Sequence, residues 1–146
     1  MWIELKDTDT KELEIYKSVM DKMDKFYLSY TVEKYAKHIR RGDRSFYYND
    51  GELHYFITFH WNPLRDMWKI ICVGFTGSDE PNTVADIGFE KVKAFMIETS
   101  SQLYGTRPNV MDDPLINIHH DRWISKPETT IESYKENTTL CRFSLG

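Results

Sequence analysis

The spacing of apolar residues in the first 42 positions predicts a short strand followed by two helices. Residues 3–5 alternate in polarity as a strand does. Over residues 13–27, apolar side chains recur at steps of three and four, which predicts a helix with one buried face. Asp9 and Glu12 have the spacing of a capping box at its start. A second helix is expected from Thr31 to a glycine stop at Gly42.

Between residues 45 and 75 the pattern changes to the period of a sheet. Asp50-Gly51 is typical of a hairpin turn between two strands, and residues 52–61 then alternate regularly. Residues 67–75 are apolar at both odd and even positions. Such a strand is buried on both sides, so we expect helices on both faces of the sheet.

The second half of the chain predicts a long helix and a closing hairpin. After a polar loop over residues 76–82, a helix is expected to begin at Thr83 and to stop at Gly105. A loop over 107–114, a strand over 115–119 and strands over 130–134 and 139–145 are expected to follow. The order β-α-α-β-β-β-α-β-β-β, with one helix missing near its end, predicts an α+β fold with a mixed, mostly antiparallel sheet. Residues 1–146 are expected to form a single domain.

Composition narrows the classes of function. The 146 residues carry 19 basic and 23 acidic side chains, a formal charge of −4, which argues against a chain that coats nucleic acid. No apolar stretch approaches the roughly 20 residues of a membrane span, so a cytoplasmic protein without membrane insertion is expected. Cys72 and Cys141 do not form a disulfide framework. His54 and His60 share one face of a strand but lie about 20 Å apart, too far to hold one metal ion.

The element order over residues 1–105 resembles that of the GNAT (Gcn5-related N-acetyltransferase) fold. The chain is also similar in size and layout to small GNAT-like proteins of short-tailed bacteriophages. The resemblance implies acetyl-coenzyme A as a cofactor, with its diphosphate bound by backbone amides of a glycine-rich turn before the long helix. Unpaired N–H groups and the helix dipole attract anions at such a place.

The resemblance also assigns candidate residues. The backbone from Phe75 through Gly77 to Ser78 would bind the pantetheine arm, and the amides from Thr83 to Gly88 would bind the diphosphate. Ile87-Gly88 occupies the place of an Ile-Gly pair, but Asp86 and Val84 stand where glycines are expected, and Thr83 where Arg or Gln is expected. Family members often use a carboxylate on the last meander strand and a tyrosine near the end. The catalytic candidates are therefore Asp66 and Tyr134, with Tyr104 near in position.

Charge at the start of the long helix decides between two functions. Asp79, Glu80 and Asp86 would each repel a diphosphate by about 1 kcal/mol, which offsets the 0.3–1 kcal/mol or so of the helix dipole. The sequence therefore favours a non-catalytic protein-interaction factor without cofactor. The resemblance in layout implies that this factor is a bacteriophage virion-assembly, ejection or host-directed protein. The alternative is an acetyl-CoA-dependent N-acetyltransferase with an atypical loop.

Two charged segments are candidate interaction surfaces. One is acidic, with Asp79 and Glu80, and the other is basic, with Lys34, Lys37, Arg40, Arg41 and Arg44. The expected partner is another protein, a virion or host component. Lys37, Arg40 and Arg41 also raise a third hypothesis, a contact with nucleic acid. A phage-encoded chain is expected in the host cytoplasm or the virion.

Overall fold

The computed structural model describes residues 1–5, 42–108, 112–134 and 137–146, and a few residues in between. Those few are Glu14, Lys17, Ser18, Asp21 and Lys22, which have helical backbone, and the two-residue strand Lys25–Phe26. The helical residues fall in the first predicted helix, over 13–27, but its predicted end is wrong because Lys25–Phe26 form a strand. The second predicted helix and the basic residues Lys34, Lys37, Arg40 and Arg41 lie outside the described residues.

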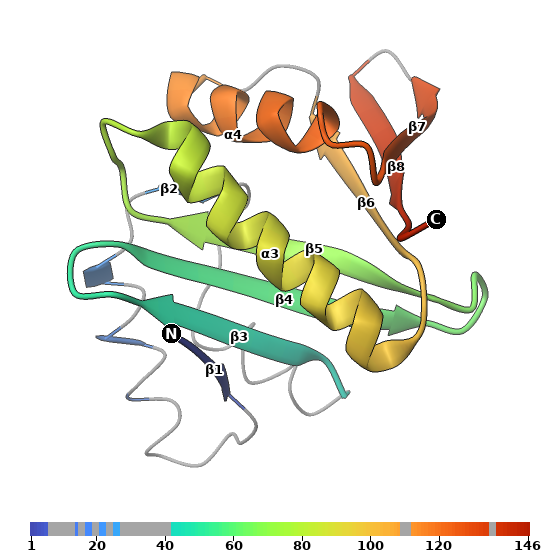
Figure 1. The fold of residues 1–146 in the computed structure, drawn as a ribbon, viewed down its shortest axis with the longest axis horizontal. Coiled ribbons are helices and arrows are strands. Elements are labelled where there is room, and N and C mark those ends of the chain that lie inside the picture. The colour runs from blue at the N-terminus through green and yellow to red at the C-terminus, as the bar shows by residue number, and fades with distance from the viewer. Residues whose placement is uncertain are drawn as a thin grey trace.

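Within the described residues, eight strands form one mixed sheet and the two helices α3 and α4 pack on it (Figure 1). The strands are β1 (Trp2–Leu5), β2 (Lys25–Phe26), β3 (Arg44–Asn49), β4 (His54–Asn62), β5 (Met67–Phe75), β6 (Leu103–Pro108), β7 (Thr129–Tyr134) and β8 (Thr138–Phe143). The helices are α3 (Pro81–Thr99) and α4 (Pro114–Ile124). The strand order is β1-β3-β4-β5-β6-β8-β7, with β2 paired to β5, and only β5 and β6 are parallel. The predicted α+β class is confirmed.

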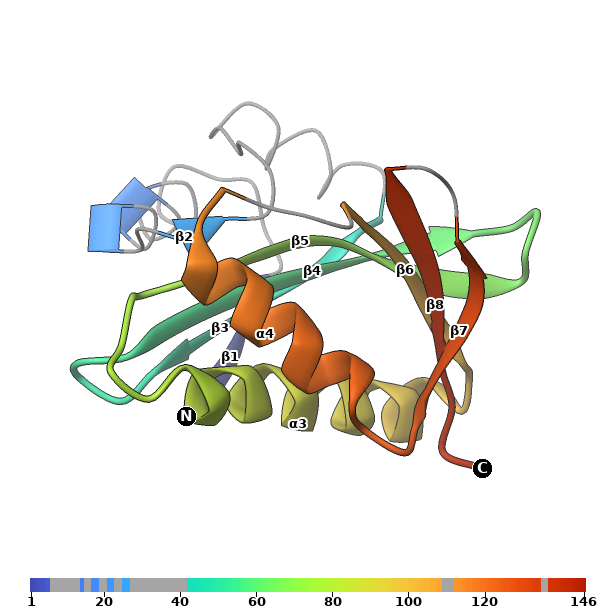
Figure 2. The ribbon, with the colours of Figure 1, turned by 90° about the horizontal axis from the view of Figure 1, so that it is seen from above.

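The central strands are buried on both sides, as the sequence predicts. Tyr55, Ile57 and Phe59 of β4 are fully buried in the core against α3, and Phe56 and Thr58, between them, are also fully buried. Figure 2 shows α3 and α4 on the same face of the sheet. The first two predicted helices fall on residues that are largely undescribed.

Helix α3 has the buried face that the sequence predicts but different ends. Ala85, Gly88, Phe89, Val92 and Met96 are all buried, as expected. The helix begins with Pro81 as its first residue, which is favourable because proline lacks the N–H that a first turn leaves unpaired. It ends at a left-handed Ser100, so the expected start at Thr83 and stop at Gly105 are both wrong. Gly105 instead lies inside β6.

The predicted strand over residues 115–119 is also wrong, because these residues belong to α4. Asp113 caps this helix by accepting a hydrogen bond from the Leu115 amide at 2.9 Å, and Pro114 is its first residue. The buried residues of α4 are Ile116, His119, His120 and Trp123, which have helical spacing. Two of these four positions are histidines, so the apolar periodicity is hidden in the sequence. Helix α4 is the element missing from the predicted order.

Candidate functional site

Strand β5 separates from β6 after only two residue pairs. Trp68 pairs with Leu103 and Lys69 with Tyr104, and at its other end β5 pairs with β2 through Gly74 and Phe75. Between these pairings, residues 70–73 have no described strand partner on that side. We call this segment of β5 the open window. A strand edge without a partner offers peptide N–H and C=O groups to an extended ligand.

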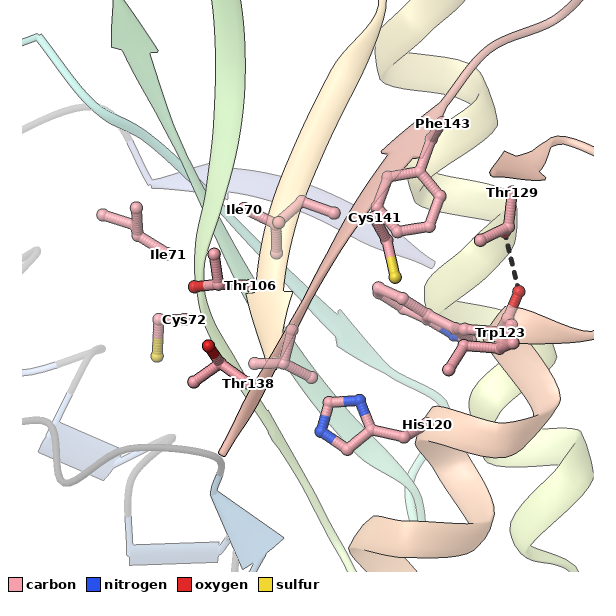
Figure 3. A pocket seen from close by; sticks show the side chains of 13 residues that line it. Ile70, Ile71, Cys72, Thr106, His120, Trp123, Thr129, Thr138, Cys141 and Phe143 are labelled. Atoms are coloured by element: carbon pink, nitrogen blue, oxygen red, sulfur yellow. Dashed lines mark hydrogen bonds between the residues drawn. The ribbon is translucent and has the colours of Figure 1, made fainter. Parts of the chain in front are cut away.

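A cavity of about 250 Å³ lies at the open window, between the diverging strands and α4 (Figure 3). Its walls come from five elements. The lining residues are Ile70, Ile71, Cys72 and Val73 of β5, Gly105 and Thr106 of β6, His120, Trp123 and Ile124 of α4, Thr129 of β7, and Thr138, Cys141 and Phe143 of β8. We call this cavity the wedge. Apolar walls with a few polar groups are typical of small-molecule sites.

A β-bulge lies in the open window. Thr58 of β4 pairs with Cys72 and Phe59 pairs with Ile70, so Ile71 has no opposite residue on β4. A bulge disrupts the ladder locally and redirects the peptide groups beside it. The bulged residue also lines the wedge. The geometry therefore presents backbone polar groups of β5 where the ladder to both neighbours is interrupted.

His120 brings an imidazole to the wedge from α4. The residue is 5% exposed, and Figure 3 shows its ring on the cavity side of the helix. The position of α4 is set by Trp123, whose Nε1 donates to the Ala85 carbonyl of α3 at 2.8 Å. The Thr129 hydroxyl donates to the Trp123 carbonyl at 2.7 Å (the dashed line in Figure 3). Imidazole is the side chain most often used for proton transfer, so His120 is a candidate for that role.

The adjacent His119 belongs to the core instead. It is fully buried, its Nε2 hydrogen-bonds the Tyr55 hydroxyl at 2.6 Å, and its ring stacks on Phe75 with centroids 4.8 Å apart. Burial, and to a lesser extent the neighbouring His120, holds the pKa of His119 well below its usual value. His119 is therefore neutral in the folded protein. Phe75, a candidate for cofactor binding by sequence, is 2% exposed and serves this packing.

The start of α3 has few free N–H donors, and the chain segment around it is acidic. Pro81 has no N–H, and the amides of Thr83 and Val84 both donate to the Glu80 carbonyl. Residues 74–90 contain no Lys or Arg, and both Asp79 and Glu80 are exposed. Ser78 accepts a hydrogen bond from the Glu80 amide at 3.0 Å. This end of α3, which we call the α3 mouth, does not fit a diphosphate.

Asp86 and Gly88 lie further along α3 and do not belong to the α3 mouth. Asp86 accepts two hydrogen bonds from Arg122, at 2.9 and 3.0 Å, and contacts Lys126 at 2.6 Å. These cations, Arg122 above all, lower the pKa of Asp86 to about 2. Its charge is thus neutralised within the α3–α4 contact. The expectation that Asp86 repels a diphosphate together with Asp79 and Glu80 is therefore wrong. A Cβ at Gly88 would overlap Tyr55, so this glycine permits close packing of α3 on β4.

Two of the catalytic candidates from the sequence, Asp66 and Tyr104, do not line the wedge. Asp66 is exposed in the β4–β5 turn, with a left-handed φ of 53°. The Tyr104 hydroxyl accepts a hydrogen bond from Asn62 at 2.7 Å, at the closed end of the β5–β6 pair. The side chain of Tyr134 lies outside the described part. His120 was missed because the sequence pattern placed it after a strand; recognition of the spacing 116, 119, 120 and 123 would have found it.

Other polar groups have structural partners. Arg44, predicted as an interaction residue, forms two 2.8 Å hydrogen bonds with Glu4 and one of 3.1 Å with Glu98, joining β1, β3 and α3. Asp43 and His60 form a pair at 2.5 Å. Within the described residues, no group of three side chains could hold a metal ion, and no helix is long and apolar enough to cross a membrane.

No protein-family model matches the sequence, and no curated protein matches it. A search of solved structures finds a chimera of spermidine N-acetyltransferase SpeG from Vibrio cholerae and hSSAT, with a TM-score of 0.57. The match covers 98% of this chain and 95% of the other at 9% identity. At that identity the likeness concerns the fold alone. The chain has a GNAT-like fold, as the element order of the sequence predicts.

Proposed function

We propose that the protein is an N-acyltransferase that binds the thioester arm of an acyl-coenzyme A in the wedge. The observation that carries this proposal is the open window over residues 70–73, beside a cavity of about 250 Å³. An extended arm with amide groups can pair with the peptide groups of a strand that lacks a neighbour. The GNAT-like fold supports the same class, because the similar solved structure is that of a spermidine N-acetyltransferase chimera.

The residues of the wedge have roles in this reaction. The thioester supplies an activated acyl carbon; an amine forms the new C–N bond there, and the C–S bond breaks. Peptide N–H groups of the open window are the candidates to stabilise negative charge on the carbonyl oxygen. His120 accepts the proton that the amine loses and returns one to the leaving sulfur. Both duties are within the capacity of one imidazole.

A second candidate function is that of a non-catalytic interaction protein, with a virion or host protein as partner. The α3 mouth favours it, because Pro81, Asp79 and Glu80 leave little to bind a diphosphate. Asp79 and Glu80 would then be part of the contact surface. This candidate predicts that acyl-CoA does not bind, whereas the first predicts binding through the thioester arm.

Isothermal titration with acetyl-CoA, and with pantetheine as a probe that lacks the diphosphate, separates the two candidates. Gly105 offers a matched pair of variants: a Cβ there meets Ile70 and Phe143 at ordinary contact distances of 3.8–3.9 Å, whereas a longer side chain competes for the wedge. We expect wild type and Gly105→Ala to bind both probes and Gly105→Leu to bind neither at an unchanged melting temperature. Absence of binding to the wild type by both probes contradicts the acyltransferase.

Transfer itself is tested by release of free coenzyme A thiol from acetyl-CoA in the presence of amines. Spermidine belongs in the panel of acceptors, because the similar solved structure is that of a spermidine N-acetyltransferase chimera. Binding without thiol release, with every amine in the panel, would leave a thioester-binding protein and not an enzyme.

A further inference from the structure

The wedge continues from the open window into an apolar chamber beneath α4. Trp123 and Ile124 of α4 line it together with Cys141 and Phe143 of β8. Figure 3 shows Trp123, Cys141 and Phe143 on the far side of β6 from Ile71 and Cys72. We call the part bounded by Trp123, Ile124, Cys141 and Phe143 the acyl chamber. The wedge is thus divided into an end with backbone polar groups and an end with apolar side chains.

The walls of the acyl chamber are held by contacts that do not depend on a ligand. The Trp123 indole is fixed by its hydrogen bond to Ala85 and stands edge-on to Phe143, with ring centroids 6.0 Å apart. Trp123 and Phe143 also both contact Phe89 of α3, at 5.7 and 6.0 Å between ring centroids. Side chains packed in this way cannot easily collapse to fill the space, so the chamber is preorganised.

The size of the wedge exceeds what an acetyl group requires. An apolar cavity of about 150 Å³ is sufficient for a benzene molecule. The wedge has about 250 Å³, although the thioester arm must occupy part of it. An acetyl group adds a single methyl beyond the carbonyl, which would leave the apolar walls of the acyl chamber unfilled. An unfilled apolar cavity forfeits the contacts its lining could make.

We infer that the preferred donor carries an apolar acyl group longer than acetyl, whose chain lies in the acyl chamber. This inference rests on the proposed function and names its substrate class. The carbonyl and the amides of the arm lie at the open window, and the hydrocarbon lies against Trp123, Ile124 and Phe143. The polar and apolar halves of the donor match the two ends of the wedge.

Binding affinity is expected to depend on the length of the acyl chain. Each methylene buried against apolar walls tightens binding by about threefold to fourfold. Hexanoyl-CoA has four more carbons than acetyl-CoA, so we expect it to bind about 100-fold tighter. The gain should stop when the chain reaches the end of the chamber.

The test is isothermal titration of the wild-type protein with acetyl-, butyryl-, hexanoyl-, octanoyl- and dodecanoyl-CoA. We expect affinity to rise with chain length beyond acetyl and then to level off or fall. Equal affinity across the series, or tightest binding of acetyl-CoA, overturns the inference but leaves the proposed function standing. Failure of every member to bind, including acetyl-CoA, overturns the proposed function itself.

A pair of variants places the chain within the chamber. Cys141→Leu enlarges the side chain by two non-hydrogen atoms and should remove most of the gain from butyryl to octanoyl while acetyl-CoA still binds. Thr130→Leu makes a similar apolar change at an exposed position of β7 outside the wedge and should leave the series unchanged. If Cys141→Leu does not fold, Ile124→Phe tests the wall that α4 contributes. An unaltered length series in a folded wall variant contradicts the assignment.

Discussion

The wedge and the α3 mouth are the two places where the fold could hold parts of one ligand, and they differ in nearly every property. The wedge has interrupted strand pairing, apolar walls and a buried imidazole at His120. The α3 mouth has a proline in place of an N–H donor, amides turned back on Glu80, and exposed carboxylates. The difference teaches that affinity here should come from the thioester arm and acyl chain, and little from phosphates.

The largest expected effect concerns the chemistry of the wedge. His120→Gln should lower kcat for acyl transfer by about 10²–10⁴-fold, because the proton-transfer group is lost. Acyl-CoA affinity should change by less than about threefold, since the peptide groups of the open window remain. Asp121→Asn, an exposed change on the same helix, is the control and should retain wild-type rates. A His120→Gln enzyme with full activity would exclude His120 from catalysis.

The next largest effect shows whether Gly88 serves the packing of α3 on β4 or belongs to the α3 mouth. Gly88→Ala places a Cβ 2.2 Å from the Tyr55 ring and hydroxyl, and we expect a loss of about 2 kcal/mol in the free energy of unfolding. Ala94→Val, on the exposed side of α3, should cost less than about 1 kcal/mol. Urea denaturation measures both. A stable Gly88→Ala protein that has lost only coenzyme A binding would show that this glycine belongs to a ligand site.

The two adjacent histidines allow the comparison to be sharpened by pH. The pKa of His119 is lowered in the folded state, so the unfolded state binds more protons below pH 6.5. Stability is therefore full above about pH 6.5 and falls as pH decreases, by up to about 1.4 kcal/mol per unit. His119→Gln should flatten this slope in urea titrations between about pH 6.5 and 5. Some slope will remain from His54, whose pKa is also lowered by burial.

The smallest effect concerns the charge of the α3 mouth. The double variant Asp79→Asn/Glu80→Gln removes two exposed carboxylates and should tighten coenzyme A binding by up to about tenfold. Pantetheine binding should not change, because it carries no phosphate, and the gain should shrink as salt is added. Asp86→Asn is the control: its carboxylate is already paired with Arg122 and Lys126, so no gain in affinity is expected.

The local pattern of apolar residues was sufficient to predict those elements in which buried positions recur at a regular spacing. The alternation over residues 52–61 and the doubly apolar run over 67–75 correspond to β4 and β5, and most of the predicted apolar face of α3 is the buried one. Helix α4 was mistaken for a strand because His119 and His120, polar by type, occupy buried positions. Burial of a histidine depends on partners such as Tyr55, 64 residues away, which no local window contains.

The amino-acid sequence by itself determined the α+β class, the order of the central strands and the acidic character of the α3 mouth, which disfavours phosphate binding. Each of these follows from residues close together in the chain. Tertiary structure alone decided where β5 leaves β6, how β8 and α4 close the wedge, and which of two adjacent histidines reaches it. It also decided that Asp86 is neutralised and that Gly88 makes room for Tyr55. These outcomes depend on contacts between distant segments, whose geometry exists only once the sheet has formed.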